Sequence, residues 1–188
     1  MTYFGVIFDK LLHLPIKMKP FSATVLVFFM LYAGTSCVKI KTLPPEPYIE
    51  YISFEVFDTV DILGNTAKGG RLKFSFEDGD GDLGLNPPQE ETVSDSVNLF
   101  LTLYRKTGGV MLPAPEDDPL RPLNYRIPYM ERTGHNKILK GTIHVTFMYL
   151  VYSESDTIKY DFFVRDRKSN ESNTESTNKI ILFENGTY

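Results

Sequence analysis

The segment with the clearest chemical potential is an acidic, glycine-rich stretch that directly follows a run of alternating apolar residues. In it Asp78, Asp80 and Asp82 are separated by single glycines. A tight loop with this spacing can aim several carboxylate oxygens at one centre, because glycine adopts the positive φ angles that such a wrap needs. Calcium is a hard cation that takes six to eight oxygen ligands. The spacing therefore predicts a Ca²⁺ site, with a solvated acidic turn as the alternative, since Asp-Gly repeats also form turns well.

A second polar segment, residues 166–170, follows a later run of alternating residues. If the chain folds as an immunoglobulin-like sandwich, the loops that contain these two segments emerge at the same end. We therefore predict that Asp166 and Asn170 complete an oxygen cage with the three aspartates. Carboxylates that meet without a cation repel one another and raise each other's pKa, which favours a bound cation at such a cluster.

The acidic segment resembles the start of an EF-hand or dockerin loop, but it departs from that pattern at two positions. Leu83 stands where the loop has its glycine, and Gln89 stands where the loop has its bidentate glutamate. No helical pattern flanks the segment either. We therefore expect a calcium site of another kind than an EF-hand.

The elements that must position these residues are predicted to be strands. Apolar and polar residues alternate with a period of two, and no stretch shows a sustained 3.6-residue pattern. We expect about seven strands, near residues 49–58, 72–76, 97–104, 125–127, 138–147, 158–164 and 179–183. Gly141 should break or bulge the fifth of these. Tyr160 is expected in the core, although a corner tyrosine is the alternative. The predicted fold is an all-β, immunoglobulin-like or fibronectin-III-like antiparallel β-sandwich.

The N-terminal region predicts export and a lipid anchor. An uncharged apolar run at residues 21–33 follows Lys17 and Lys19 and is followed by small residues and the only cysteine, Cys37. This is the order of a signal peptide, and it resembles the bacterial lipoprotein signal, with Gly34 in place of the usual leucine. We expect residues 1–36 to be the signal peptide, with translation starting at Met18. An uncleaved membrane anchor and plain secretion are the alternatives.

The rest of the chain divides into a tether and a domain. Residues 37–48 carry the lipidated Cys37 and a proline-rich stretch, which favours an extended tether. Residues 49–188 form the predicted β-sandwich. The lipidated cysteine, the tether, the acidic segment and a late Tyr…Asp-Arg…Asn…Ser segment together resemble small Gram-negative envelope lipoproteins. That resemblance implies a membrane-anchored protein of the cell envelope, in the outer membrane, with an immunoglobulin-like fold and no assigned activity.

Composition and missing motifs narrow the function. The net charge of −4 and the lack of a basic stripe argue against nucleic-acid binding. The three histidines, His13, His135 and His144, have no zinc-binding spacing, and no nucleophile elbow or phosphate-binding loop occurs. We therefore expect a non-catalytic binding or accessory module of a surface complex, stabilised by calcium, with an envelope protein or a glycan as partner. A structural subunit without a ligand and a carbohydrate-processing enzyme are the alternatives. The long segment 107–136 is a candidate binding loop, with a flexible insertion as the alternative.

Overall fold

Residues 43–87, 97–131 and 137–188 are described by the computed structural model and belong to the unit that spans Thr42–Tyr188. Cys37, the expected signal peptide and the first half of the expected tether lie outside the described residues, as do Gln89 and His135. The predictions that concern them therefore stay predictions.

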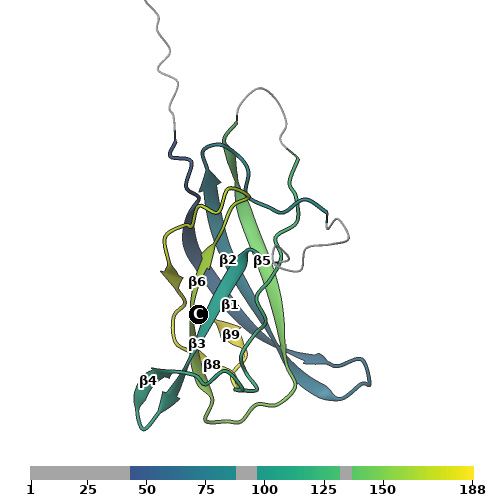
Figure 1. Ribbon diagram of the computed structural model, residues 1–188. Helices are drawn as coiled ribbons and strands as arrows, with labels where there is room; N and C mark the ends of the chain where they lie inside the picture. Colours follow the sequence, from purple (N-terminus) through teal and green to yellow (C-terminus); the bar gives the residue numbers. More distant parts are fainter. Residues whose placement is uncertain (1–42, 88–96, 132–136) are drawn as a thin grey trace, which may run out of the picture. The chain divides into compact units, whose positions relative to one another are not determined.

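Two antiparallel sheets packed face to face make up this unit (Figure 1). The first sheet has the order β5 (Leu139–Tyr149), β2 (Thr66–Asp78), β1 (Tyr48–Val60), β9 (Gly186–Thr187). The second has the order β4 (Val110–Pro113), β3 (Leu99–Thr107), β6 (Thr157–Val164), β7 (Glu175–Ser176), and β8 (Ile180–Ile181) also pairs with β6. No helix occurs in the part of the chain that is described. The prediction of an all-β sandwich is confirmed.

The chain changes sheets several times, and this connectivity places the two polar segments at one end. After the β1–β2 hairpin it crosses to β3 and β4, returns to β5 beside β2, and crosses again to β6 beside β3. The start of β3 pairs with the end of β6, with Leu99 opposite Val164. The backbone N–H of Arg167 donates to the carbonyl oxygen of Asp82 at 3.4 Å, so the loop that leaves β6 lies beside the loop that leaves β2.

A fully buried aromatic core joins the sheets. Phe54, Phe74 and Phe162 have no exposed surface, and neither has Tyr160. The hydroxyl of Tyr160 lies 2.9 Å from the hydroxyl of Tyr149 and 3.3 Å from the carbonyl oxygen of Leu120, to which it donates. Tyr160 is thus a core residue with a satisfied polar group, as predicted.

The only register shift in the long β1–β2 pairing occurs in β1, which corrects the predicted position of the bulge. The register skips Ile52, so the buried side chain is at an odd-numbered position before the bulge, Ile49, and at even-numbered positions after it, Phe54 and Val56. Gly141, where the bulge was expected, pairs with Phe76 in an unbroken register. A Cβ on Gly141 would lie 3.0 Å from the Phe76 ring, so this glycine makes room for an aromatic side chain rather than for a bulge.

Two predicted strands in the second half of the chain are wrong in extent, and one strand was missed. Residues 125–127 form only a single bridge, between Tyr125 and Leu99, because the chain there crosses between the sheets. The predicted strand at 179–183 shortens to β8, because the chain turns after Ile181, where the backbone N–H of Glu184 donates to the carbonyl oxygen of Ile181. Strand β4 was not predicted. It follows Gly108-Gly109, whose positive φ angles of 59° and 87° are those of a two-residue hairpin turn.

Candidate metal centre

Asp78 is the last residue of β2 and continues the inward face of that strand. Leu72, Phe74 and Phe76 alternate along this face, and Asp78 is the next member, with no exposed surface. Its carboxylate accepts hydrogen bonds from the backbone N–H groups of Gly81, at 3.1 Å, and Leu83, at 2.6 Å. The buried carboxylate thus holds the following residues in a tight loop around itself.

The acidic loop, residues 78–82, brings three carboxylates together. Asp78, Asp80 and Asp82 each offer one oxygen, and these oxygens all lie within 4.8 Å of one another. Gly81 has a φ of 68°, a conformation that side chains disfavour, so glycine permits this turn. Asp82 is 7% exposed, and its Oδ1 atom is buried without a hydrogen-bond partner in the described structure. The cluster therefore holds a buried acceptor whose interactions are incomplete.

The turn at residues 166–170 lies against the acidic loop, as the sandwich topology predicted. The Lys168 ammonium contacts the Asp80 carboxylate and lies 3.1 Å from Asp82 Oδ2. Arg167 donates from its side chain to the carbonyl oxygen of Gly84, at 2.6 Å. These contacts join the two loops at the end of the sandwich where β2 and β6 finish.

Asp166 and Asn170 close their own turn. The Oδ1 atom of Asp166 accepts the backbone N–H groups of Lys168 and Asn170, both at 2.8 Å, and its Oδ2 accepts from the Asn170 side chain at 2.7 Å. Asp166 is only 3% exposed. The three converging oxygens come from the acidic loop alone, so the ligand roles of Asp166 and Asn170 stay predictions. The Arg167 guanidinium points away from Asp166 and lies 5.3 Å from the centre of the Tyr129 ring.

The carboxylates of the acidic loop do not share one electrostatic environment. Burial raises the pKa of Asp78, although its two backbone hydrogen bonds act in the opposite direction. Burial also raises the pKa of Asp82, and the charges of Asp166 and Asp80 add to this rise. Burial alone would raise the pKa of Asp80, but hydrogen bonds from Lys168 and the neighbouring aspartates hold it below its usual value. A single ammonium, on a side chain that is 62% exposed, thus balances only part of the local negative charge.

The start of the domain packs against the acidic loop, which the sequence did not indicate. A Cβ on Gly79 would overlap the carbonyl oxygen of Pro44 and lie 2.6 Å from that of Leu43. Only glycine therefore allows this close backbone approach. The residues that enter β1 lie at the same end as the carboxylate cluster.

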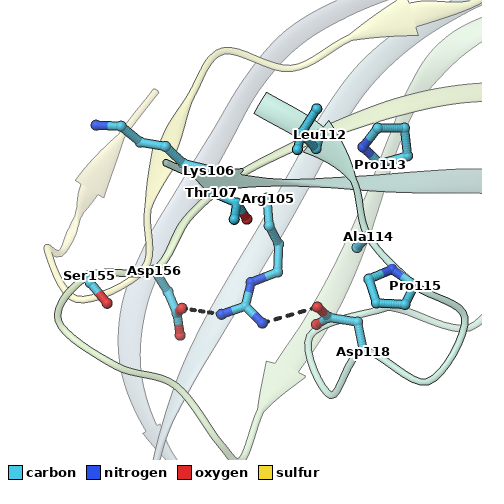
Figure 2. A pocket seen from close by; sticks show the side chains of 10 residues that line it. All are labelled: Arg105, Lys106, Thr107, Leu112, Pro113, Ala114, Pro115, Asp118, Ser155 and Asp156. Atoms are coloured by element: carbon cyan, nitrogen blue, oxygen red, sulfur yellow. Dashed lines mark hydrogen bonds and ion pairs between the residues drawn. The ribbon is translucent and has the colours of Figure 1, made fainter. Parts of the chain in front are cut away.

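Figure 2 shows a second polar constellation, in a pocket of about 310 Å³ beside β3 and β4. Arg105 lies between two carboxylates. It contacts Asp118 at 3.0 Å and also bonds to Asp156, and the side chains of these aspartates are only 5% and 7% exposed. The second oxygen of each aspartate accepts a backbone N–H, from Leu120 at 2.9 Å and from Ser153 at 2.7 Å.

Arg105, Asp118 and Asp156 are each paired within this network, which is therefore suited to holding loops in place. It fastens the predicted binding loop and the β5–β6 connection to β3. Three pockets of about 310 to 340 Å³ open among the described residues, and none of these three is lined by the acidic loop. The carboxylate cluster is therefore not part of the wall of any of these three pockets.

Comparison with protein-family models, with curated proteins and with solved structures gave no match to this chain. Within the described residues, no helix has the length and apolar character needed to cross a membrane.

Proposed function

We propose that this chain is a non-catalytic envelope lipoprotein whose β-sandwich binds Ca²⁺ through Asp78, Asp80 and Asp82. The proposal rests on three carboxylate oxygens that lie within 4.8 Å of one another. In addition, the Oδ1 atom of Asp82 is buried and has no hydrogen-bond partner in the described structure. A buried acceptor left unpaired costs about 1–3 kcal/mol. A divalent cation at this point would satisfy that oxygen and offset the repulsion between the carboxylates.

The donor set fits calcium better than a transition metal. All the converging atoms are carboxylate oxygens, which are hard ligands, and no histidine or cysteine takes part in the cluster. Each oxygen of Asp78 accepts one backbone hydrogen bond, which leaves lone pairs for a cation. Carbonyl oxygens, water, Asp166 and Asn170 are the candidates for the remaining ligands that calcium needs.

Lys168 competes with the cation in this proposal. Its ammonium contacts two of the three carboxylates, but its side chain is largely exposed and can swing into solvent. Exchange of one ammonium for Ca²⁺ would add one positive charge to the cluster. The calcium would then hold the loop after β2 in place against the residues that precede β1 and stiffen this end of the sandwich.

The proposed lipid anchor precedes this end of the domain by only a few residues in the sequence. Leu43 stands six residues after Cys37 in the sequence, and six extended residues span at most about 20 Å. A diacylglyceryl group on Cys37 would therefore hold the acidic loop near the surface of the outer membrane. We further propose an immunoglobulin-like class for the fold. The pairing of β2 with β5 and of β3 with β6 across two sheets supports it, because strands B and E and strands C and F are arranged this way.

Isothermal titration tests the calcium site. We expect saturable binding to the wild type and none to Asp80→Ala, since Asp80 is the most accessible of the three carboxylates and its loss removes one ligand. Asp117→Ala is the matched control, because Asp117 is an exposed acid of another loop and should leave the binding unchanged. Equal heats for the wild type and Asp80→Ala, or no heat for either, would contradict the site.

Metabolic labelling with a palmitate analogue tests the anchor. The wild type should be labelled in a bacterial host that processes lipoproteins, and Cys37→Ala should not, since the chain contains one cysteine. Equal labelling of both proteins would remove the lipoprotein proposal and leave the calcium site untouched.

A further inference from the structure

The acidic loop lies at the end of the sandwich where the chain enters the domain. Tyr48, the first residue of β1, pairs with Glu77, which precedes Asp78, and Figure 1 shows β2 finishing beside the entry of the chain. The far end of β1 is about 40 Å away, because this strand has thirteen residues. The proposed anchor at Cys37 precedes Leu43 by six residues, which span at most about 20 Å. The tether would therefore hold the end with the acidic loop closest to a membrane that carries the anchor.

The carboxylate cluster does not supply enough ligands for calcium by itself. Asp78, Asp80 and Asp82 bring one oxygen each to a common point, whereas calcium takes six to eight. Both side-chain oxygens of Asp166 accept hydrogen bonds within their own turn. About three or more coordination positions are therefore left for other oxygen atoms.

Lys168 marks a side on which the cluster is open to solvent. Its ammonium contacts Asp80 and lies 3.1 Å from Asp82 Oδ2, while its side chain is 62% exposed. An oxygen atom from outside the protein can reach a bound Ca²⁺ along the same path. Calcium would also take over the two carboxylates that hold Lys168, which would leave the ammonium free to bind an anion.

Side chains beside the cluster suit a surface of lipid phosphates. Arg167 lies in the same turn as Lys168, and its guanidinium lies 5.3 Å from the centre of the ring of Tyr129, a residue that is 46% exposed. Tyrosine is enriched where a membrane meets water, and arginine and lysine bind phosphate. Without calcium the carboxylates of the acidic loop would repel a phosphate. A bound Ca²⁺ adds two positive charges and removes that repulsion.

We propose that Ca²⁺ docks this end of the domain on the phosphate groups of the membrane that holds the anchor. Phosphate oxygens of lipid headgroups would complete the coordination of Ca²⁺, and Lys168 and Arg167 would bind neighbouring phosphates. The inference rests on the proposed calcium site and lipid anchor, and it names the partner of that site. Because coupling between two ligands is reciprocal, phosphate lipid must raise the affinity for calcium by the factor by which calcium strengthens docking.

Calcium titration of the lipidated full chain in two kinds of vesicle tests the proposal. One kind is made of phosphatidylcholine and the other of a galactolipid without phosphate. Both lipids are uncharged overall, so neither concentrates calcium at its surface. We expect about fivefold tighter calcium binding in the phosphatidylcholine vesicles, a factor at the lower end of typical coupling between ligands. Lys168→Met should reduce this preference, whereas Lys106→Met, an exposed position near the other end of β3, should leave it unchanged.

A fluorophore on an introduced cysteine shows which end of the domain docks. Ser169→Cys places it in the turn at residues 166–170, and Ile62→Cys places it between β1 and β2, where Ile62 is 99% exposed. The introduced thiol is the only free one, because the single cysteine of the chain, Cys37, would carry the lipid. In phosphatidylcholine vesicles with a quencher attached to some headgroups, calcium should quench the dye at residue 169 and leave the dye at residue 62 unchanged.

Three results would overturn the proposal: equal calcium affinity in the two kinds of vesicle, quenching at residue 169 that does not depend on calcium, or equal quenching of the two dyes. Each of these leaves intact a protein that binds calcium in detergent micelles and incorporates the palmitate analogue. Loss of calcium binding in every setting, or of the palmitate label, would instead show that the proposed function itself fails. The two failures are therefore distinguishable.

Discussion

Replacing Arg105 with leucine should lower the free energy of unfolding by about 3 kcal/mol. Arg105 is the only cation bonded to the carboxylates of Asp118 and Asp156 in the described structure, and their side chains are 5% and 7% exposed. Removing one partner of a buried charge pair costs about 3–5 kcal/mol, because the remaining charge is left uncompensated. Arg105 itself is 32% exposed, so water screens part of the interaction and the lower end of that range applies.

Arg71→Leu is the matched control for this measurement. Arg71 pairs with Glu55 at 2.9 Å, which is close to the 3.0 Å between Arg105 and Asp118. The side chains of Arg71 and Glu55 are, however, both nearly half exposed. Exposed pairs contribute about 1 kcal/mol or less. Urea unfolding of both variants at neutral pH, with midpoints compared at unchanged slope, gives the two values.

The expected loss of stability arises from the burial of the Asp118 and Asp156 carboxylates rather than from the number of ion pairs. Neutralising one carboxylate should therefore restore part of the loss, so Arg105→Leu combined with Asp118→Asn should be more stable than Arg105→Leu alone. Equal destabilisation by Arg105→Leu and Arg71→Leu would refute the reasoning, as would a double variant that is less stable than the single one.

Three further predictions concern the end of the sandwich that carries the acidic loop. Lys168→Met should raise the affinity for Ca²⁺ in a titration, because it removes the ammonium that competes for two of the carboxylates; unchanged or weaker binding would contradict that competition. Calcium affinity should fall as the pH is lowered, and it should begin to fall at a higher pH than for ordinary aspartates, since protons compete with the metal and burial has raised the pKa of Asp78 and Asp82; affinity that stays constant on acidification would show that these groups are not ligands. Gly84→Ala should destabilise the fold more than Gly64→Ala in urea unfolding. Both glycines have positive φ angles, 95° and 85°, which cost about 1–2 kcal/mol for another residue, but only at Gly84 would the new Cβ overlap a backbone carbonyl. Equal losses would contradict the close packing at Gly84.

Periodicity predicted the inner face of β2 correctly, because Leu72, Phe74 and Phe76 are its only large apolar residues and alternate strictly. Asp78 is the next residue in this alternation, so the pattern could have predicted that its carboxylate lies inside the fold. In β1 apolar residues occur at both odd-numbered and even-numbered positions, so the sequence pattern does not reveal the bulge at Ile52. A bulge was expected at Gly141, but the space that a glycine leaves can serve a neighbouring ring as well as a turn of the chain.

Long-range polar contacts were beyond the reach of sequence patterns. Arg105 and Asp156 are 51 positions apart, and Lys168 and Asp80 are 88 apart, so no local spacing connects them. The meeting of the two loops was predictable, because it follows from the topology of a sandwich. The particular side chain that crosses between them was not, since Asp166, Arg167 and Lys168 are all capable of such a contact and only rotamer and turn geometry select Lys168.

The proposed function depends on a calcium site formed by Asp78, Asp80 and Asp82. The decisive measurement is a titration of Ca²⁺ into the calcium-free full chain, in parallel with Asp80→Ala. We expect one saturable site in the wild type, an increased unfolding temperature on loading, and neither effect in Asp80→Ala. A wild type that shows no binding heat and no calcium-dependent stabilisation would contradict it, and would leave the acidic loop as a turn held by Lys168 and the backbone alone.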